Sequence, residues 1–432
     1  MSVNSLHSVV SVATKVWMQI LRGAPLDKEL SNLEGSKEIK SAVQSIIYTT
    51  QRNRALAIAL SNKLMERKSK PVIEALIQVS LVQIIEGRRS VFAIVNECVK
   101  ASKFLDKNPR VSGFVNAVLR RFCREKDELI KQVSKDETVL FNAPNWWIKR
   151  YQDVFGTDSK EVFEVQKKHP PMTLRVNQRK LSRGDYKAKL DTLAIESSLV
   201  GDDGIVLKKP VRVEQIPGFM DGEVSVQDAG SQLAAKILGV KNGMRVLDAC
   251  SAPGGKTAHL AEIADLDLLA LEIDPLRAGR IHENLSRLGL SCEVKVSDSG
   301  NVDKWWDGEK FDRILLDAPC TASGIVRRHP DIPWVRRPED IQNLAKEQNR
   351  LLENLWPLLA KGGRLLYAVC SVFPEEGVNQ ISNFISTHSD AVMVPFCNAP
   401  KGYLRLKPSD EVRENGTSDC HDGFFYALIE KS

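Results

Sequence analysis

Apolar residues recur at helical spacing through the first third of the chain. The apolar stripes lie at residues 9–21, 42–48, 55–64, 71–85, 91–104 and 111–122. A spacing of three and four residues places such positions on one face of a helix. No long stretch in this region alternates apolar and polar residues as a half-buried strand does. The pattern therefore predicts an all-helical domain over residues 1–141.

A mixed segment follows the helical region. The sequence Asn142-Ala143-Pro144-Asn145 interrupts the helical pattern and is typical of a linker. Beyond it, the short apolar runs Met172–Val176 and Gly204–Leu207 alternate with turn residues, which favours strands. We therefore expect residues 142–235 to form a linker and a small α+β subdomain.

Strand-like runs alternate with helical stretches over residues 236–432. The runs end at Asp248, Glu272, Asp298, Asp317 and Ser371, and the helical stretches cover residues 256–263, 276–288, 338–359 and 375–385. This alternation predicts a parallel sheet with helices on both faces, which binds ligands beyond the carboxyl ends of its strands. One acid at a strand end is common, but four of five runs end in an acid. The series favours a polar ligand.

The loop after the first of these strands carries two adjacent glycines. It reads Cys250-Ser251-Ala252-Pro253-Gly254-Gly255-Lys256. Glycine lets backbone pass close to a ligand, and the next helix begins with unpaired N–H groups. The loop ends like a phosphate-binding P-loop, but that motif needs glycine where Cys250 stands, and Pro253 removes an N–H group. Nucleotide hydrolysis is therefore disfavoured.

Two acids are spaced to meet a nucleoside beside this loop. Glu272 lies 24 residues after Asp248. An acid about 20 residues past such a glycine turn commonly accepts hydrogen bonds from ribose hydroxyls. Asp298, at the end of the third strand, is expected at the edge of an adenine.

Two cysteines follow the fourth and fifth strands. Cys320 ends the sequence Asp317-Ala318-Pro319-Cys320, and Cys370 precedes Ser371. Adjacent strands would bring both thiols to one edge of the sheet. A lone cysteine is most often inert core packing, but a pair beside a ligand site suits covalent catalysis. A thiolate that adds to C6 of cytosine makes C5 nucleophilic enough to take an activated methyl group.

The charge is distributed unevenly along the chain. The net charge is +6, but residues 1–140 hold 23 Lys and Arg against 14 Asp and Glu. A positive N-terminal region favours a polyanion partner, although solubility alone explains such a charge equally well. A second basic group follows Cys320 and combines arginines with an aromatic, which suits phosphate contact and base stacking. We predict that it contacts RNA through Arg327, Arg328, Trp334, Arg336 and Arg337.

Composition excludes several classes of protein. The chain is 43% hydrophobic and 27% charged, as globular proteins are, and no apolar run reaches the ~18 residues of a membrane span. Its start lacks the features of a signal peptide. The eight cysteines form no C-x-x-C pair, so we expect no metal and reduced thiols. These observations predict a cytoplasmic protein, and we expect a monomer.

The motifs together resemble a known family. Ala-Pro-Gly-Gly-Lys at 252–256, Asp-Ala-Pro-Cys at 317–320 and Cys-Ser at 370–371 are similar to RNA cytosine-C5 methyltransferases of the Sun/Fmu and nucleolar-protein type. The resemblance spans nearly the whole chain. Residues 114–121 resemble the helical NusB-like domain that precedes the catalytic domain in the bacterial members acting on 16S ribosomal RNA. The expected fold is a Rossmann-like methyltransferase domain after an all-α NusB-like domain and a small α+β segment.

The resemblance implies a role for each matching residue. Cys370 would attack C6 of the cytosine, and Cys320 would assist release of the methylated base. The loop from Cys250 to Lys256, with Glu272, Asp298 and Asp317, would hold S-adenosylmethionine, and Asp317 would also face the cytosine. The implied substrate is a 16S cytosine of the position-967 type. In the related DNA enzymes the nucleophile is the cysteine that Cys320 matches, but a second cysteine at position 370 favours the RNA type.

Two departures from the family pattern leave these roles intact. Val369 replaces the usual threonine before the nucleophile, and Glu272 replaces an aspartate. An alternative remains open, in which a NusB-type chain binds RNA as a ribosome-assembly or antitermination factor without catalysis. Another alternative is methylation of a different RNA.

Overall fold

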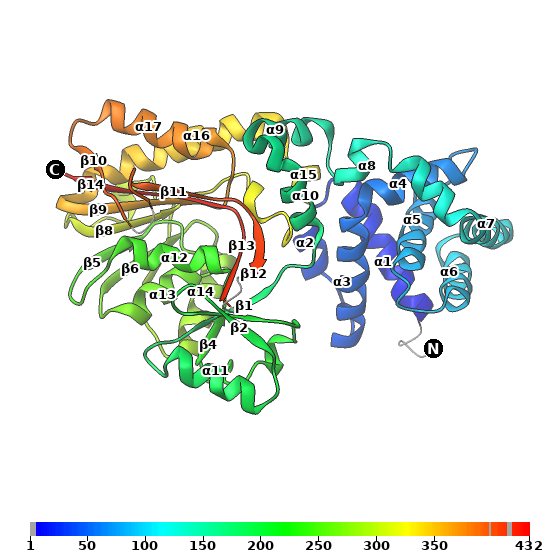
Figure 1. Ribbon diagram of the computed structural model, residues 1–432, viewed down its shortest axis with the longest axis horizontal. Helices are drawn as coiled ribbons and strands as arrows, with labels where there is room; N and C mark the ends of the chain where they lie inside the picture. The colour runs from blue at the N-terminus through cyan, green and yellow to red at the C-terminus, as the bar shows by residue number, and fades with distance from the viewer. Residues whose placement is uncertain (1–5, 397–398, 413–416) are drawn as a thin grey trace. The chain divides into compact units, whose positions relative to one another are not determined.

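The computed structural model describes residues 6–396, 399–412 and 417–432, which fall into two compact units (Figure 1). One unit contains residues up to 156 together with 329–336, and the other contains the remaining residues. Among the described residues, no helix combines the length and the apolar character needed to cross a membrane.

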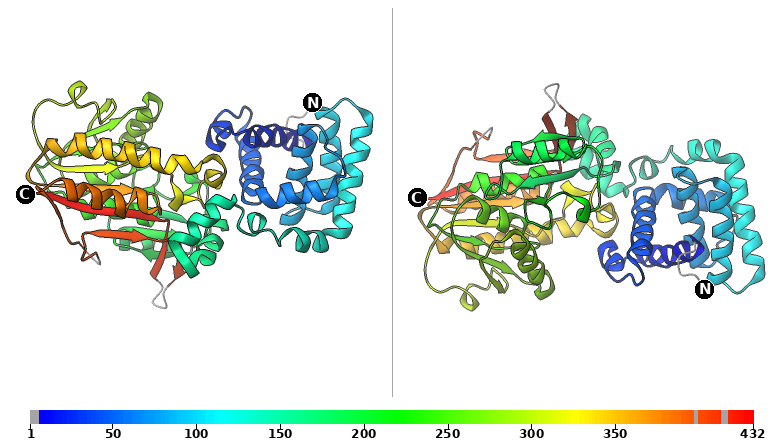
Figure 2. Two further views of the ribbon diagram at one scale, coloured as in Figure 1. Left: turned by 90° about the horizontal axis from the view of Figure 1, so that it is seen from above. Right: turned by 90° about the horizontal axis from the view of Figure 1, so that it is seen from below.

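The first unit is helical, as predicted for residues 1–141. Its helices are α1 (Leu6–Leu21), α2 (Leu26–Ser31), α3 (Lys37–Arg52), α4 (Arg54–Leu64), α5 (Pro71–Glu86), α6 (Val91–Leu105), α7 (Pro109–Val133), α8 (Glu137–Phe141) and α9 (Asn145–Phe155). Helix α5 buries most of its residues between Ile73 and Ile84 and packs against α1, α3, α4, α6 and α7. A helix of this kind forms the centre of a core rather than its surface. Figure 2 shows the helices of this unit from two further directions.

The expected linker at residues 142–145 is an ordered turn. Asn142 takes the left-handed conformation (φ 52°) that ends α8. Its side chain accepts a hydrogen bond from the Ala55 amide at 3.0 Å and donates one to the Gln51 carbonyl at 3.0 Å. Both contacts fix the chain to the junction of α3 and α4. Asparagine suits this position because its short polar side chain tolerates positive φ.

The second unit is built on a sheet with the strand order β10-β14-β9-β8-β5-β6-β7. Its parallel strands are β5 (Arg245–Asp248), β6 (Asp267–Glu272), β7 (Glu293–Val296), β8 (Phe311–Asp317) and β9 (Leu359–Val369). The prediction of a parallel sheet holds for these strands. It missed an antiparallel part, in which β14 (Phe424–Lys431) pairs with β9, β10 (Ala391–Met393) and β11 (Tyr403–Leu406).

Helices cover both faces of this sheet, as expected. On one side lie α12 (Ala229–Leu238), α13 (Gly255–Ile263) and α14 (Pro275–Leu288), and on the other lie α16 (Pro338–Leu355) and α17 (Val378–Thr387) (Figure 1). Successive strand residues point to opposite faces. Leu315 therefore packs with the α12–α13 core, whereas Leu316 packs with the α16–α17 core. Helix α16 is shorter than predicted, because Pro357 follows it and cannot continue a helix.

A smaller sheet has the order β12-β13-β2-β3-β1-β4. The predicted strands at Met172–Val176 (β1) and Gly204–Leu207 (β3) are confirmed, and β2 (Ser197–Val200) and β4 (Val224–Val226) join them, covered by α11 (Arg183–Thr192). The other two strands come from much later in the chain. They are β12 (Ser409–Val412) and β13 (Thr417–His421), and β13 pairs in parallel with β2.

Candidate active site

The glycine loop has the tight geometry that its sequence predicts. Gly254 adopts φ +92°, and a Cβ there would lie 3.2 Å from the Cα of Ile281. A side chain at this position would therefore be strained, and only glycine lets the loop turn into α13. Arg175 on β1 supports this loop, although no motif in the sequence pointed to it. Its buried guanidinium donates to the Gly255 carbonyl at 2.7 Å and pairs with Glu262 at 2.7 Å.

The acid series is brought together around this loop. Glu272 ends β6 and accepts hydrogen bonds from the amides of Ala252 at 3.3 Å and Asp274 at 3.0 Å. Asp298 lies two residues beyond β7, where Arg350 binds it at 3.0 Å. Burial acts to raise the pKa of Asp298, but the hydrogen bonds from Arg350 and Gly300 lower it overall. Both acids therefore lie at the carboxyl edge of the sheet.

Lys256, the last residue of the loop, contacts one of the acids directly. It forms an ion pair with Asp317 at 2.7 Å. Burial acts to lower the pKa of Lys256, but Asp317 raises it overall, so the ammonium stays charged. Asp248, at the end of β5, is buried and accepts a hydrogen bond from Thr257 at 2.7 Å. Burial raises the pKa of this carboxyl and outweighs the backbone amide of Cys250, the second residue after Asp248, which acts to lower it.

Stability should depend on pH through Asp248. Burial, assisted by the charge of Asp317, raises the pKa of this carboxyl to about 7. In the unfolded chain an aspartate has a pKa of about 4. Between about pH 4 and 7 the folded protein therefore binds one more proton than the unfolded chain, and the free energy of unfolding falls as pH rises through this range. The Asp248→Asn variant has no carboxyl to titrate and should not lose stability in this way. The free energy of unfolding of the variant minus that of the native protein, measured by urea titration, should therefore increase between pH 5 and pH 8. A difference that does not change with pH would contradict the raised pKa of Asp248.

The two cysteines of the sequence prediction lie in contact. Cys370 follows the last residue of β9, Cys320 follows β8 by three residues, and their sulfur atoms are 3.4 Å apart. The hydrogen bond with Cys370 and burial raise the pKa of the Cys320 thiol well above its ordinary value. Cys320 therefore stays protonated. The seven cysteines within the described residues form no disulfide, and Cys397 lies outside those residues.

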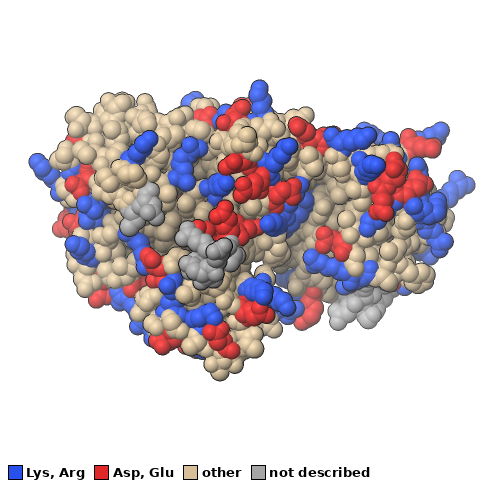
Figure 3. Space-filling model, viewed as in Figure 1, with Lys and Arg blue, Asp and Glu red and all other residues tan. Residues whose placement is uncertain are grey.

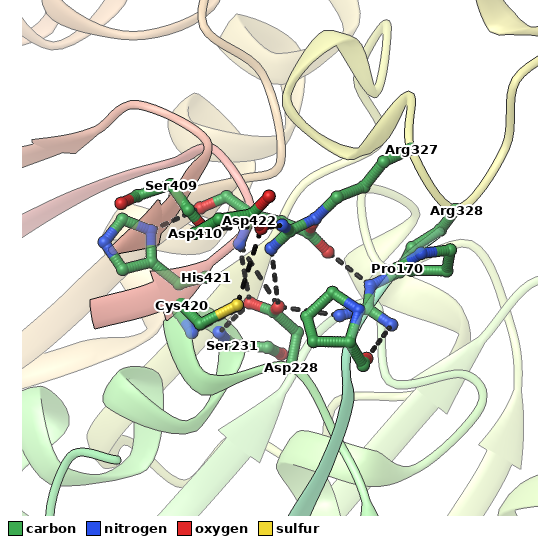
Figure 4. A network of polar contacts seen from close by, with 12 residues as sticks. Pro170, Asp228, Ser231, Arg327, Arg328, Ser409, Asp410, Cys420, His421 and Asp422 are labelled. Atoms are coloured by element: carbon green, nitrogen blue, oxygen red, sulfur yellow. Dashed lines mark hydrogen bonds and ion pairs between the residues drawn. The ribbon is translucent and has the colours of Figure 1, made fainter. Parts of the chain in front are cut away.

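The arginines predicted to bind RNA are separated by the structure. Arg327 is 0% exposed and donates to Asp422 and Asp410. Arg328 is mostly buried and pairs with Asp228 at 2.8 Å and with Asp422 (Figure 4). Burial raises the pKa of Asp422, and nearby Asp228 adds to the effect. This cluster joins the loop after Cys320 to α12 and to the β12–β13 strands, and it leaves Arg327 no surface for RNA.

Loss of Arg327 should act on stability rather than on RNA binding. Removing one partner of a buried ion pair leaves an uncompensated charge and costs about 3–5 kcal/mol. We expect Arg327→Ala to lower the free energy of unfolding by that amount in guanidinium titrations. Arg337→Ala, which removes an exposed arginine, serves as the control. If Arg327→Ala kept its stability but bound RNA more weakly, the result would instead support the prediction that Arg327 contacts RNA.

The remaining RNA candidates lie around residues 329–336, which pack with the helical unit. The Leu26 amide donates to Asp331 at 3.3 Å, and Gln51 donates to the Pro330 carbonyl at 3.2 Å. The guanidinium of Arg54 lies 4.8 Å from the ring centre of Trp334. Trp334 and Arg336 are half-buried, and Arg337 is exposed. On the face drawn in Figure 3, basic and acidic side chains of the described residues are interspersed.

The strand order, the glycine turn and the helices on both faces define the Rossmann-like methyltransferase fold. The chain belongs to the 16S rRNA methyltransferase RsmB/F family, whose model matches residues 235–430. A ferredoxin-like domain of RsmF/B-like methyltransferases matches residues 143–214, and the NusB family matches residues 6–124.

Relatives match along nearly the whole chain. Ribosomal RNA small subunit methyltransferase B of Vibrio vulnificus (strain YJ016) is 38% identical, with 98% of this chain and 99% of that protein covered. The protein of the same name from Pseudomonas syringae pv. tomato (strain DC3000) is 37% identical, with 97% and 96% covered. A solved methyltransferase homologue from Pyrococcus horikoshii is 29% identical, covers 69% of this chain and 98% of its own, and superposes with a TM-score of 0.59.

Proposed function

We propose that this protein transfers a methyl group from S-adenosylmethionine to C5 of a cytosine in 16S ribosomal RNA, of the position-967 type. The observation that carries the proposal is the 3.4 Å contact between Cys320 and Cys370 beside the glycine loop. The names of the relatives, which are methyltransferases of small subunit ribosomal RNA, support the substrate class.

The residues around the loop suit S-adenosylmethionine. The loop from Cys250 to Gly255 brings backbone close to the ligand, and Glu272 and Asp298 offer acceptors for the ribose and the adenine edge. When bound, the sulfonium supplies an activated methyl group. No group of His, Cys, Asp and Glu within the described part of the chain is arranged to hold a metal ion.

The two thiols have different roles in the proposed reaction. The Cys370 thiolate would form a bond to C6, and the electron pair of the C5–C6 double bond would make C5 the nucleophile that takes the methyl group. The methyl–sulfur bond of the donor breaks in this step, and its electron pair returns to the donor sulfur. A base then removes the C5 proton, the C5–C6 double bond returns and the bond to Cys370 breaks. Cys320 remains a thiol beside the sulfur that leaves, which suits it to assist release. Asp317, held by Lys256, faces the cytosine in this proposal.

The target base must be single-stranded or flipped to reach these thiols. Trp334, Arg336 and Arg337 are the candidates that would contact the surrounding RNA. Removing one phosphate contact reduces the salt dependence of binding by about one unit of slope. We expect Arg337→Ala to do so in filter-binding titrations with ribosomal RNA while the affinity for S-adenosylmethionine stays unchanged. Lys361→Ala, at the opposite end of β9, is the control. An unchanged slope would remove Arg337 from the RNA surface.

The direct test measures transfer of tritiated methyl from S-adenosylmethionine to ribosomal RNA that lacks the modification, followed by bisulfite sequencing of the product. Protection of one 16S cytosine is the expected result. Transfer to another RNA would identify a different substrate. Folded protein that binds RNA but transfers nothing to any RNA would favour the alternative, a NusB-type assembly or antitermination factor.

A further inference from the structure

Glu376 is a buried acid that the chemistry above does not use. It ends a short 3-10 turn (Pro374–Glu376) after β9 and is 0% exposed. Its carboxylate accepts four hydrogen bonds. The amide of Thr321 donates at 2.8 Å and the side chain of Gln348 at 3.1 Å to one oxygen, and the hydroxyls of Thr321 and Ser371 donate to the other. Two carboxylate oxygens offer about four acceptor sites, so every site is filled.

These donors come from both cysteine loops. Thr321 follows Cys320 directly, and Ser371 follows Cys370 directly. One carboxylate therefore holds the residue after each thiol. Gln348 on α16 extends the link, since its amide also donates to the Pro319 carbonyl at 2.9 Å.

Additional contacts fasten the same two loops. The Ser323 and Ser371 hydroxyls are 2.9 Å apart, and the Val372 amide donates to Ser323 at 2.9 Å. The Gly324 amide donates to the Cys370 carbonyl at 2.9 Å. Glu376 is the centre of this arrangement, because its carboxyl group accepts hydrogen bonds from residues of both loops.

We infer that Glu376 is a positioning residue that sets the distance between the sulfur atoms of Cys320 and Cys370. It acts through its hydrogen bonds to Thr321 and Ser371, the residues that directly follow the two thiols. Its importance for catalysis rests on the proposed function, but its control of the sulfur separation does not.

Glu376 also affects the protonation of Cys320. The hydrogen bond with Cys370 and burial are the largest causes of the raised pKa of Cys320, and the carboxyl of Glu376 raises it further. Burial raises the pKa of Glu376 itself, while its four hydrogen bonds oppose that rise. The same residue that holds the loops together thus helps to keep Cys320 protonated beside Cys370.

Disulfide formation between the thiols measures their separation without requiring methyl transfer. A diazene oxidant such as diamide takes two electrons and two protons from Cys320 and Cys370, which join as a disulfide while the diazene becomes a hydrazine. Mass spectrometry of the linked peptides follows the rate in the full chain. We compare Glu376→Ala and Glu376→Gln with Glu353→Gln, which changes a partly exposed acid on α16.

We expect Glu376→Ala to slow disulfide formation and to lower kcat for methyl transfer, each by about 10²-fold, because displacements near 1 Å have effects of this size. KM for S-adenosylmethionine should not change. In Glu376→Gln the hydroxyls of Thr321 and Ser371 can turn to accept from the amide, so its disulfide rate should stay within about threefold of the native rate.

The glutamine variant keeps the test decisive if Glu376→Ala does not fold. A native disulfide rate in folded Glu376→Ala overturns the inference, even if methyl transfer is lost. A Glu376→Gln rate about 10²-fold below the native rate, or a Glu353→Gln rate as slow as that of Glu376→Ala, overturns it as well. A slowed disulfide with no methyl transfer by the native chain supports the positioning role and contradicts only the proposed function.

Discussion

A Cys320→Ala variant is expected to accumulate a covalent complex with its RNA, whereas Cys370→Ala should form no complex and transfer no methyl groups. Cys370 directly follows β9 and is the thiol proposed to attack C6. Cys320 is 3.4 Å away and held protonated, so its loss should leave attack possible and impair release. Labelled RNA that migrates with the protein on a denaturing gel measures the complex.

Two further variants complete this comparison. The double variant Cys320→Ala, Cys370→Ala should give no complex, because it lacks the nucleophile. Cys123→Ala, which alters a partly exposed thiol on α7, should behave as the native protein does. A complex that forms in Cys370→Ala but not in Cys320→Ala would exchange the roles of the two thiols.

Loss of the Glu272 carboxylate should weaken S-adenosylmethionine binding about 100-fold, which corresponds to about 3 kcal/mol from two hydrogen bonds to a charged acceptor. Glu272 also receives the Ala252 amide, so Glu272→Ala removes an anchor of the glycine loop together with the ribose acceptor. Isothermal titration of S-adenosylmethionine into Glu272→Ala measures the change in Kd.

The shorter acid separates these contributions. Glu272→Asp retains a carboxylate and should recover most of the affinity, as aspartate is the usual residue in the family. Glu283→Ala removes an exposed acid from α14 and should leave Kd unchanged. Native affinity in Glu272→Ala would exclude this acid from the ligand site.

The parallel part of the sheet was predictable because most of its strands are followed by a turn and a helix. The thiol pair followed from the same logic, since neighbouring strands end at one edge. Strand β14 was missed because no helix precedes it in the way that a parallel crossover requires, and its residues Phe424–Ile429 form one continuous apolar run. A continuous apolar run indicates a buried segment, but it does not show whether a strand pairs in parallel or antiparallel.

Long-range polar contacts were beyond sequence reasoning. Arg327 has the residue type and the position of an RNA contact, but partners from distant segments, among them Asp410 and Asp422, make it a buried structural group. Glu376 was equally hidden, because one acid in a Pro-Glu-Glu turn resembles any helix start. Its meaning depends on donors from Thr321, 55 residues earlier. Periodicity describes which face a residue occupies, but not which distant partner it meets.

The pairing of β13 with β2 has a consequence for synthesis on the ribosome. Strand β2 is complete by Val200, but its partner does not begin until Thr417. A growing chain therefore exposes one edge of the smaller sheet while more than half of the second unit is still being translated, and unpaired edges recruit other strands. Asp422, which neutralises Arg327 and Arg328, emerges later still. Nascent chains stalled before these residues should be the forms of this protein most prone to aggregate.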